Sequence, residues 1–203
     1  MIKNAVFDIG GVLLEYEPER FIRCFGFDEA DIKPLLKTIF KSDVWLELDK
    51  GTLSFKEAED ITAGRAPEYE KQIRTVYSDS ERDALFGEKG GTVAFMRELK
   101  RDGYMIYLLS NFSREGYKHI EAKYGFIKEA HGGVISSAVG MIKPEPGIYK
   151  ALIDKYGLIP GETVFIDDVQ ANVAAANGFG INGILFTDIE EVKHKFYLLT
   201  EGV

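Results

Sequence analysis

Hydrophobic residues along this chain gather in short runs that are separated by longer stretches with helical periodicity. Five of the runs are rich in β-branched and aromatic residues and end in polar or turn residues, which is typical of buried strands. They cover residues 4–8, 104–110, 133–136, 163–167 and 183–186. Strands that alternate with helices pair in parallel, because a parallel pair needs a long crossover connection. The pattern predicts a parallel sheet of five strands.

The stretches between the later strands carry apolar residues at helical spacing, and each is closed by glycine or by a cluster of turn residues. They cover residues 92–101, 113–124, 148–156 and 171–177. Helices that connect parallel strands cover both faces of the sheet. We therefore predict an α/β fold with a doubly wound, Rossmann-like sheet.

One segment interrupts the alternation of strands and helices. Residues 17–86 contain helical patterns at 32–40, 55–63 and 68–78 but no convincing strand. The alternation resumes after the glycine-containing segment 87–91, so the insertion lies within one core rather than between two domains. We expect a core of residues 1–16 and 87–203 that carries a small helical cap of residues 17–86.

Composition and charge exclude several classes of protein. Apolar residues make up 45% of the 203 positions and charged residues 29%, which is typical of a globular protein. A formal net charge of −8 opposes binding to nucleic acid. No run approaches the ~18 apolar residues of a membrane-spanning helix, and no secretion signal is recognisable. The single cysteine, Cys24, has no partner for an internal disulfide. We expect a cytoplasmic protein with no nucleic-acid or membrane partner; its oligomeric state is left open.

Polar side chains follow three of the predicted strands. Asp8 ends the first, Ser110 and Asn111 end the second, and Asp167 and Asp168 end the fourth. Ligands of an open parallel sheet bind outside the carboxyl ends of its strands, so these side chains are expected at one site. Clustered carboxylates repel one another unless a cation lies among them, and oxygen ligands suit Mg²⁺. The sequence therefore predicts a magnesium site.

A lysine in the segment MIKPEP, residues 141–146, completes the candidate site. Two prolines flank the acidic residue of this segment and stiffen the chain around Lys143. An acidic protein repels a phosphorylated ligand at long range, so a phosphate site needs a local cation. Lys143 is the candidate for that cation.

Four motifs occur in order along the chain. They are VFDIGGVL at 6–13, LLSN at 108–111, KP at 143–144 and FIDDVQAN at 165–172. With these motifs the chain resembles the haloacid dehalogenase-like hydrolase superfamily, in the branch with a helical cap inserted after the first strand. It is similar to sugar-1-phosphatases and to the N-terminal domains of epoxide hydrolases in that branch.

The resemblance implies a Mg²⁺-dependent phosphatase that hydrolyses a small phosphorylated metabolite through an aspartyl-phosphate, with sugar phosphates among the candidate substrates. It implies that Asp8 is the nucleophile and that Lys143 neutralises charge. It implies phosphate binding by Ser110, Asn111 and Lys143. The implied magnesium ligands are Asp8, the carbonyl of Gly10, Asp167 and Asp168.

One position departs from the pattern of the family's phosphatases. The residue two positions after the nucleophile is usually a second aspartate that acts as general acid and base, and here it is Gly10. General acid help is typically worth ~10²–10⁴-fold in rate. Three replacements are open: Glu15 or Glu17 in the following segment, an ordered water, or a substrate whose leaving group needs no proton.

The sequence is also compatible with two other functions, and it contains further residues that could face a ligand. A catalytically impaired phosphate-binding or regulatory protein and a 2-haloacid dehalogenase remain as alternatives. We expect the three histidines to be surface residues without catalytic roles, and Arg23, Arg65 and Arg74 are left open as substrate contacts. Aromatic residues of the insertion are more often core than ligand contacts; the residues concerned are Phe21, Phe25, Phe27, Phe40 and Trp45.

Overall fold

The computed structural model describes residues 1–78 and 85–201, so residues 79–84 of the expected cap lie outside the described residues. Five parallel strands form one sheet in the order β3-β2-β1-β4-β5. The strands are β1 Asn4–Phe7, β2 Met105–Ser110, β3 Gly132–Ile135, β4 Thr163–Asp167 and β5 Asn182–Leu185. The predicted five-stranded parallel sheet is confirmed.

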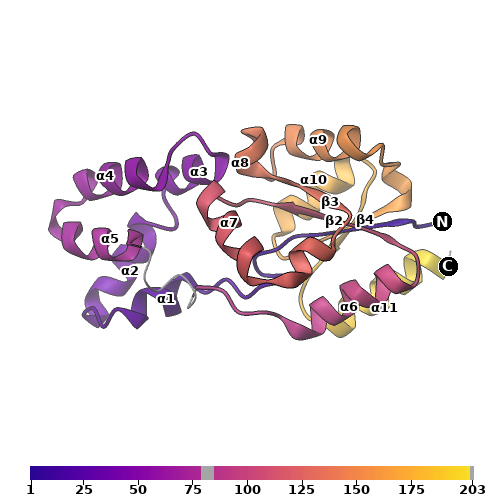
Figure 1. Cartoon of the computed structure of the whole chain (residues 1–203), viewed down its shortest axis with the longest axis horizontal. Helices are drawn as coiled ribbons and strands as arrows, with labels where there is room; N and C mark the ends of the chain where they lie inside the picture. Colours follow the sequence, from indigo (N-terminus) through magenta and orange to yellow (C-terminus); the bar gives the residue numbers. More distant parts are fainter. Residues whose placement is uncertain (79–84, 202–203) are drawn as a thin grey trace.

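Helices cover both faces of this sheet, as a doubly wound fold requires (Figure 1). Helices α6, Gly90–Arg101, and α11, Ile189–Glu201, contact each other and lie against β2 and β5. Helices α9, Pro146–Tyr156, and α10, Gln170–Gly178, contact β3, β4 and β5. Among the described residues, no helix is long and apolar enough to cross a bilayer.

The alternation of side chains along each strand builds the two layers of the core. Phe7 of β1 belongs to the hydrophobic cluster that includes Phe95 and Phe196 of α6 and α11. The preceding residue, Val6, belongs to a second cluster with Tyr149 of α9. Successive side chains of a strand point to opposite faces, so β1 is apolar on both sides and is buried between the helices.

The strand order places three strand ends at one point. Phe7 of β1 pairs with Leu108 of β2 on one side and with Ile166 of β4 on the other. The chain runs outward from β1 to β2 and β3, and then returns to β4 on the opposite side of β1. This is the topological switch point at which open α/β sheets bind ligands.

Five helices precede α6 and lie to one side of the sheet in Figure 1; we refer to them as the cap helices. They are α1 Pro18–Cys24, α2 Glu29–Thr38, α3 Asp43–Lys50, α4 Phe55–Arg65 and α5 Glu70–Tyr77. The sequence predicted α2, α4 and α5, but it missed the seven-residue α1 and the eight-residue α3. It also missed α11, whose buried Val192 and Phe196 stand among charged residues.

Shorter elements complete the core. Helix α7, Arg114–Lys123, follows β2 and was predicted, whereas the four-residue helix α8, Ser136–Val139, was not. Among the described residues, 3₁₀ helices cover Gly125–Glu129 and Pro160–Glu162 in the core and Pro67–Tyr69 between α4 and α5. Ser113 begins α7 by accepting a hydrogen bond from the backbone N–H of Gly116, so the chain turns directly from the end of β2 into a helix.

The end of α3 is attached to the core. The Ser136 hydroxyl donates a 2.6 Å hydrogen bond to the carbonyl of Asp49, and Lys50 forms a 2.7 Å ion pair with Glu145. Gly51 ends the helix at φ +75°, and a Cβ there would lie 2.6 Å from the carbonyl oxygen of Ser137. Only glycine fits both this conformation and this close approach. The contacts hold one cap helix at a fixed place over the strand ends.

Candidate active site

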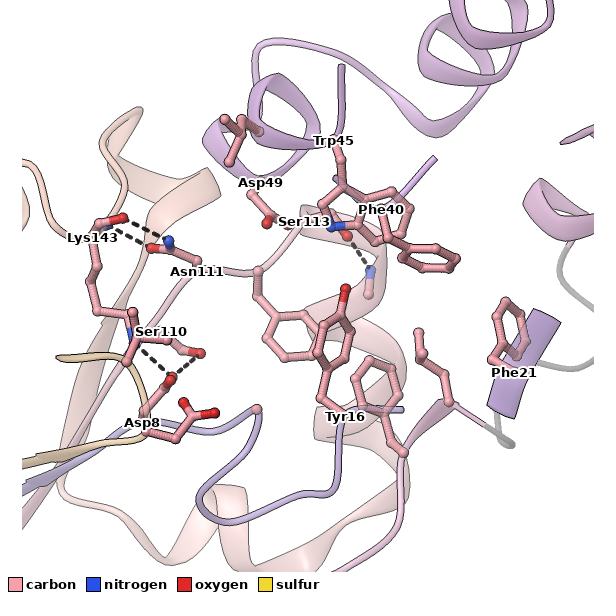
Figure 2. Close-up of a pocket in the computed structure, with 18 of the residues that line it drawn as sticks. Asp8, Tyr16, Phe21, Phe40, Trp45, Asp49, Ser110, Asn111, Ser113 and Lys143 are labelled. Atoms are coloured by element: carbon pink, nitrogen blue, oxygen red, sulfur yellow. Dashed lines mark hydrogen bonds and ion pairs between the residues drawn. The ribbon is translucent and has the colours of Figure 1, made fainter. Parts of the chain in front are cut away.

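The Asp8 carboxylate lies directly after β1 and is buried. Its Oδ1 accepts hydrogen bonds from the Ile9 backbone N–H at 2.7 Å and from the Ser110 hydroxyl at 2.6 Å. The same oxygen lies 2.8 Å from the Lys143 ammonium (Figure 2). Among the described residues these hydrogen bonds all go to Oδ1. The second oxygen, Oδ2, is therefore available for a ligand or for reaction.

Lys143 is buried beneath this carboxylate, and its ammonium also bonds Asp167 Oδ2 at 2.6 Å. Asn111 holds the lysine's backbone: its Oδ1 accepts from the Lys143 N–H at 2.7 Å, and its Nδ2 donates to the Lys143 carbonyl at 3.0 Å. Both ends of the Asn111 amide are thus bound to Lys143. The predicted residues after β2 and in the segment 141–146 meet at one site.

The two aspartates after β4 differ in their surroundings. Asp167 is fully buried and accepts from the Val169 N–H at 2.8 Å and from the Asn172 amide at 3.0 Å, besides its bond to Lys143. Asp168 is exposed and lines the cavity above the site. One carboxylate oxygen from each of Asp8, Asp167 and Asp168 lies within 4.8 Å of the others. Three hard oxygen donors at this spacing fit a magnesium ion.

Burial and the charges of neighbouring groups shift the pKa values of the ionisable side chains in this cluster. Burial raises the pKa of Asp8 to about 6; Lys143 opposes the rise and Asp167 adds to it. The Asp168 side chain is exposed to the cavity, but partial desolvation of its carboxylate there, followed by repulsion from Asp167, raises its pKa. Burial alone would lower the pKa of Lys143, but the charges of Asp8 and Asp167 outweigh it and hold this pKa above its usual value. Three carboxylates face one ammonium, so the excess negative charge favours a bound cation.

Adjacent glycines follow the first strand and have different constraints. Gly11 has φ +80°, and a Cβ there would lie 2.2 Å from Asp168 Oδ2. Its carbonyl accepts a 2.6 Å hydrogen bond from Lys89. Gly10 has no positive φ, and its nearest neighbour to an added Cβ is the Tyr16 Cβ at 3.8 Å. A side chain therefore fits at Gly10 but not at Gly11.

A cavity of about 290 Å³ lies between Asp8 and the cap helices. Its walls include Phe21, Phe40 and Trp45 (Figure 2). These three aromatic residues were expected to belong to the core: Phe21 is part of the hydrophobic cluster and Phe40 and Trp45 pack against it, and all three also face the site. Phe25 and Phe27, which stack on each other, are not among the residues that line the cavity. The sequence could not separate the two groups, because which aromatic side chains face the cavity depends on how the short helices pack against the core.

A family model for haloacid dehalogenase-like hydrolases matches residues 2–180 of the chain. The chain belongs to the haloacid dehalogenase-like hydrolase family. The family, the fold class and the hydrolase assignment that the four motifs predicted are thereby confirmed.

Relatives of this haloacid dehalogenase-like hydrolase include two phosphatases that align over most of their length. The sesquiterpene phosphatase astK of Aspergillus oryzae is 26% identical over 194 residues, which are 92% of this chain and 90% of that protein. The D-ribitol-5-phosphate phosphatase of Bacteroides thetaiotaomicron is 27% identical over 207 residues, with 89% of each chain aligned.

A solved structure resembles this one over nearly its whole length. A HAD family enzyme of Bacteroides thetaiotaomicron, crystallised with magnesium and inorganic phosphate, superimposes with a TM-score of 0.76. The alignment covers 97% of this chain and all of that chain at 26% identity. A related protein thus binds both magnesium and phosphate in this fold.

The acids that the sequence offered as replacements for the missing general acid do not reach the cavity of this hydrolase. Glu15 and Glu17 pair with Arg20 at 3.8 and 2.7 Å, and neither lines the cavity. Asp49, in the last turn of α3, does line it (Figure 2). The sequence analysis missed this residue. An acidic side chain in the last turn of a helix interacts unfavourably with the negative end of the helix dipole, so its presence there could have indicated a functional role.

The basic residues that were left open as substrate contacts are engaged elsewhere. Arg23, Arg65 and Arg74 form ion pairs with carboxylates of the cap segment. None of the three lines the cavity, and neither do the histidines. The Nδ1 atom of His131 accepts a hydrogen bond from the Ile106 N–H at 2.9 Å, so this histidine supports the edge of the sheet.

The two adjacent glycines give a matched test of the loop after β1. Gly11→Ala should lower the free energy of unfolding by about 1–2 kcal/mol from the backbone alone and should also displace Asp168. Gly10→Ala should change it by less than about 1 kcal/mol, because its conformation is open to alanine. Thermal unfolding of the two variants measures the difference. Equal melting temperatures would contradict the close approach of Gly11 to Asp168.

Proposed function

We propose that this hydrolase is a Mg²⁺-dependent phosphatase that cleaves the phosphate monoester of a small metabolite through an aspartyl-phosphate on Asp8. The observation that carries the proposal is the Asp8 carboxylate, held at Oδ1 by Ser110 and Lys143 beside the donors Asp167 and Asp168. The phosphatase names of two full-length relatives support it. We assign the roles below on that basis.

In the first step, Asp8 Oδ2 attacks phosphorus, and the bond between phosphorus and the leaving oxygen breaks. The Ser110 hydroxyl and the Lys143 ammonium, already within bonding distance of Oδ1, bind the phosphoryl oxygens. Asn111 assists by holding the Lys143 backbone, since both ends of its amide bond to that residue. Positioning and charge neutralisation account for most of the catalysis of phosphoryl transfer.

The magnesium ion would be held by Asp8, the Gly10 carbonyl and Asp168, with Asp167 beneath them. When bound, it neutralises negative charge on the phosphoryl oxygens and on the carboxylates. Both oxygens of Asp167 already accept hydrogen bonds from Lys143, Asn172 or the Val169 N–H. Asp167 therefore acts chiefly by orienting Lys143. The exposed Asp168 is the better candidate for a magnesium ligand.

In the second step, water attacks the phosphorus of the aspartyl-phosphate and releases inorganic phosphate, which regenerates the Asp8 carboxylate. We propose that residues 17–86 act as the cap that excludes bulk water during this cycle, and that residues 1–16 and 87–203 form the core. Helix α3 supplies Trp45 to the wall opposite Asp8, and the turn between α2 and α3 supplies Phe40, in support of that division.

The alternatives have less support. A 2-haloacid dehalogenase has no use for a metal site, and the Asp167–Asp168 pair would repel its carboxylate substrate. A catalytically impaired phosphate-binding protein fits the loss of the acid at Gly10. However, the nucleophile, the hydroxyl, the lysine and both acids are all in place, which favours turnover.

Substitution of the nucleophile tests the phosphoenzyme. Asp8→Asn should reduce phosphate release from p-nitrophenyl phosphate to a trace, because an amide cannot form the aspartyl-phosphate. Acid-quench trapping of labelled phosphate on wild-type protein should place it on Asp8. Asp154→Asn, an exposed substitution of the same type on α9, is the control and should keep full activity. Retained activity in Asp8→Asn would show that another nucleophile operates.

The two aspartates after β4 should separate metal affinity from stability. Asp168→Asn should raise the Mg²⁺ concentration for half-maximal activity at least ~10-fold with little change in melting temperature, because Asp168 is exposed. Asp167→Asn should lower the free energy of unfolding by about 3 kcal/mol, because it removes a buried partner of Lys143. Activity assays across Mg²⁺ concentrations and thermal melts measure both. Full activity of wild-type protein after exhaustive chelation would exclude the metal site.

A further inference from the structure

The wall of the cavity opposite Asp8 is built mainly from aromatic side chains. It includes Phe21, Phe40, Trp45, Phe55, Phe86 and Phe112. They come from the cap helices, from the segments that flank them and, for Phe112, from the loop after β2, so the apolar surface faces the site from more than one side. A ligand attached to a phosphate at Asp8 must extend along this surface.

Several polar groups on this wall are already bonded within the protein. The Trp45 indole donates to the Tyr16 hydroxyl oxygen, and the Tyr77 hydroxyl lies 3.2 Å from that of Thr62. The Ser113 hydroxyl accepts from the Gly116 N–H to begin α7. These bonds use part of the hydrogen-bonding capacity of the wall, so fewer of its groups remain for the hydroxyls of a sugar or polyol.

The balance of solvation then favours an apolar ligand. Each methylene that leaves water for an apolar wall improves affinity about fourfold, whereas a hydroxyl that loses water without a partner weakens it. The cavity volume of about 290 Å³ accommodates roughly ten water-sized groups at about 30 Å³ each. The space suits a short alkyl, isoprenoid or aryl group.

We infer that the leaving group of the substrate is apolar, an alkyl or aryl alcohol and not a sugar or polyol. This inference rests on the proposed phosphatase function, because it concerns the same site. It departs from the sugar phosphates that the motifs suggested.

A matched pair of substrates tests the inference. Pentyl phosphate and ribitol 5-phosphate have the same five-carbon chain and a primary alkoxide leaving group, and they differ in four hydroxyls. Pentyl phosphate should give a kcat/KM at least ~100-fold higher, because the apolar wall rejects the hydroxyls. A kcat/KM that is equal, or higher for ribitol 5-phosphate, would overturn the inference while leaving the phosphatase function intact.

Binding can be measured without turnover. Trp45 is the single tryptophan of the chain and lines the cavity, so its fluorescence reports occupancy. In Asp8→Asn with Mg²⁺ present, pentyl phosphate should bind at least ~10-fold more tightly than ribitol 5-phosphate. If wild-type protein releases no phosphate from any ester but this preference holds, the proposed function fails and the apolar site stands. Equal dissociation constants would overturn the apolar site.

A pair of valines provides the matched variants. Val76 of α5 lines the cavity, whereas Val44 of α3 is equally buried outside it. Val76→Thr adds a hydroxyl with little change of shape and should reduce the preference for pentyl phosphate several-fold. Val44→Thr should leave the preference unchanged, with a similar loss of melting temperature. The same preference in both variants would show that the wall does not select the substrate.

A separate observation concerns Asp49, the carboxyl that the cap contributes to the cavity. Its carboxylate accepts a hydrogen bond from the Ser113 backbone N–H, and its own carbonyl is held by Ser136. Among residues 1–78 and 85–201, the carboxyls that line the cavity are Asp8, Asp49 and Asp168. Asp49 is the one of these three that lies outside the predicted metal cluster.

The surroundings of Asp49 suit an acid that is protonated near neutral pH. Although the side chain keeps some contact with the cavity, burial raises its pKa to about 7, and the charge of Asp8 adds to the rise. The Ser113 N–H and the Lys143 ammonium act in the opposite direction. The Tyr16 hydroxyl also faces this carboxyl. A carboxylic acid in an apolar site acts as a proton donor in other hydrolases.

We propose that Asp49 is the proton donor that replaces the acid absent at Gly10. As the bond from phosphorus to the leaving oxygen breaks, its electron pair stays on that oxygen, which takes the proton of Asp49. The resulting carboxylate then accepts a proton from the water that attacks the aspartyl-phosphate. The cycle returns Asp49 to its acid form and consumes one water per ester.

The dependence on leaving group distinguishes this role from a structural one. Asp49→Asn keeps an acceptor for the Ser113 N–H, and it should lower kcat/KM, which reports the first step alone, ~10²–10⁴-fold on whichever of pentyl phosphate and ribitol 5-phosphate is the better substrate. The loss of kcat/KM on p-nitrophenyl phosphate should be less than about threefold, because nitrophenolate leaves without a proton. Glu15→Gln is the control and should change neither rate. Equal losses on both classes of substrate would overturn the proposal.

The pH profile and a second substitution provide further readouts. The ratio of alkyl to nitrophenyl rates should fall as pH rises through about 7, since the acid form of Asp49 is lost, and this fall should be absent in Asp49→Asn. The ratio cancels titration of Asp8 and of Lys143, which act on both substrates, and comparison with Asp49→Asn removes the contribution of the two phosphates, which titrate at different pH. Adding Gly10→Asp to Asp49→Asn should restore at least ~10-fold in alkyl turnover, because a side chain fits at Gly10. A pH-independent ratio in wild-type protein would overturn the role of Asp49.

Discussion

The arrangement of this protein depends on the bonds of one buried ammonium to two buried carboxylates. Lys143 lies 2.8 Å from Asp8 and 2.6 Å from Asp167, and all three side chains are withdrawn from solvent. Removing charges from water is costly unless each has a partner. The parallel strands β1 and β4 bring the two carboxylates together, and the Asn111 amide holds the lysine's backbone between them. The remaining excess of negative charge fits a divalent cation beside Asp168.

The charged cluster lies at a topological switch point of the sheet, and the cap helices lie over it. The strand ends provide the nucleophile and the charged groups but no surface for the rest of the substrate. The cap helices provide that surface, and the attachment of α3 through Ser136 and Glu145 holds it in place. Most of the reacting groups thus lie at the strand ends, whereas much of the apolar surface lies on the cap helices, which also contribute Asp49. This division fits a family in which proteins with the same fold are named for terpenoid and polyol phosphates.

Gly10 and Gly11 are adjacent, but they lack a side chain for different reasons. Gly11 is required by its backbone conformation and by the approach of Asp168, so its absence of a side chain is structural. Gly10 is free of both constraints, and its absence of a side chain removes a catalytic group. A carboxyl across the cavity, at Asp49, makes the loss tolerable in the reaction that we propose. An apolar cavity suits such an acid, because low polarity keeps it protonated near neutral pH.

The sequence by itself determined the sheet and the residues at its edge. Strand periodicity is local, and parallel strands place their carboxyl ends together, so Asp8, Ser110 and Asp167 could be assigned to one site without coordinates. Lys143 followed from its motif. Only the tertiary structure decided which aromatic residues of the insertion face the site: Phe40 and Trp45 line the cavity, whereas Phe25 and Phe27 do not. It also decided that Asp49 lines the cavity and that Glu15 does not. These positions depend on how short helices pack against the core, and contacts between residues so far apart in the chain leave no periodic signal in the sequence.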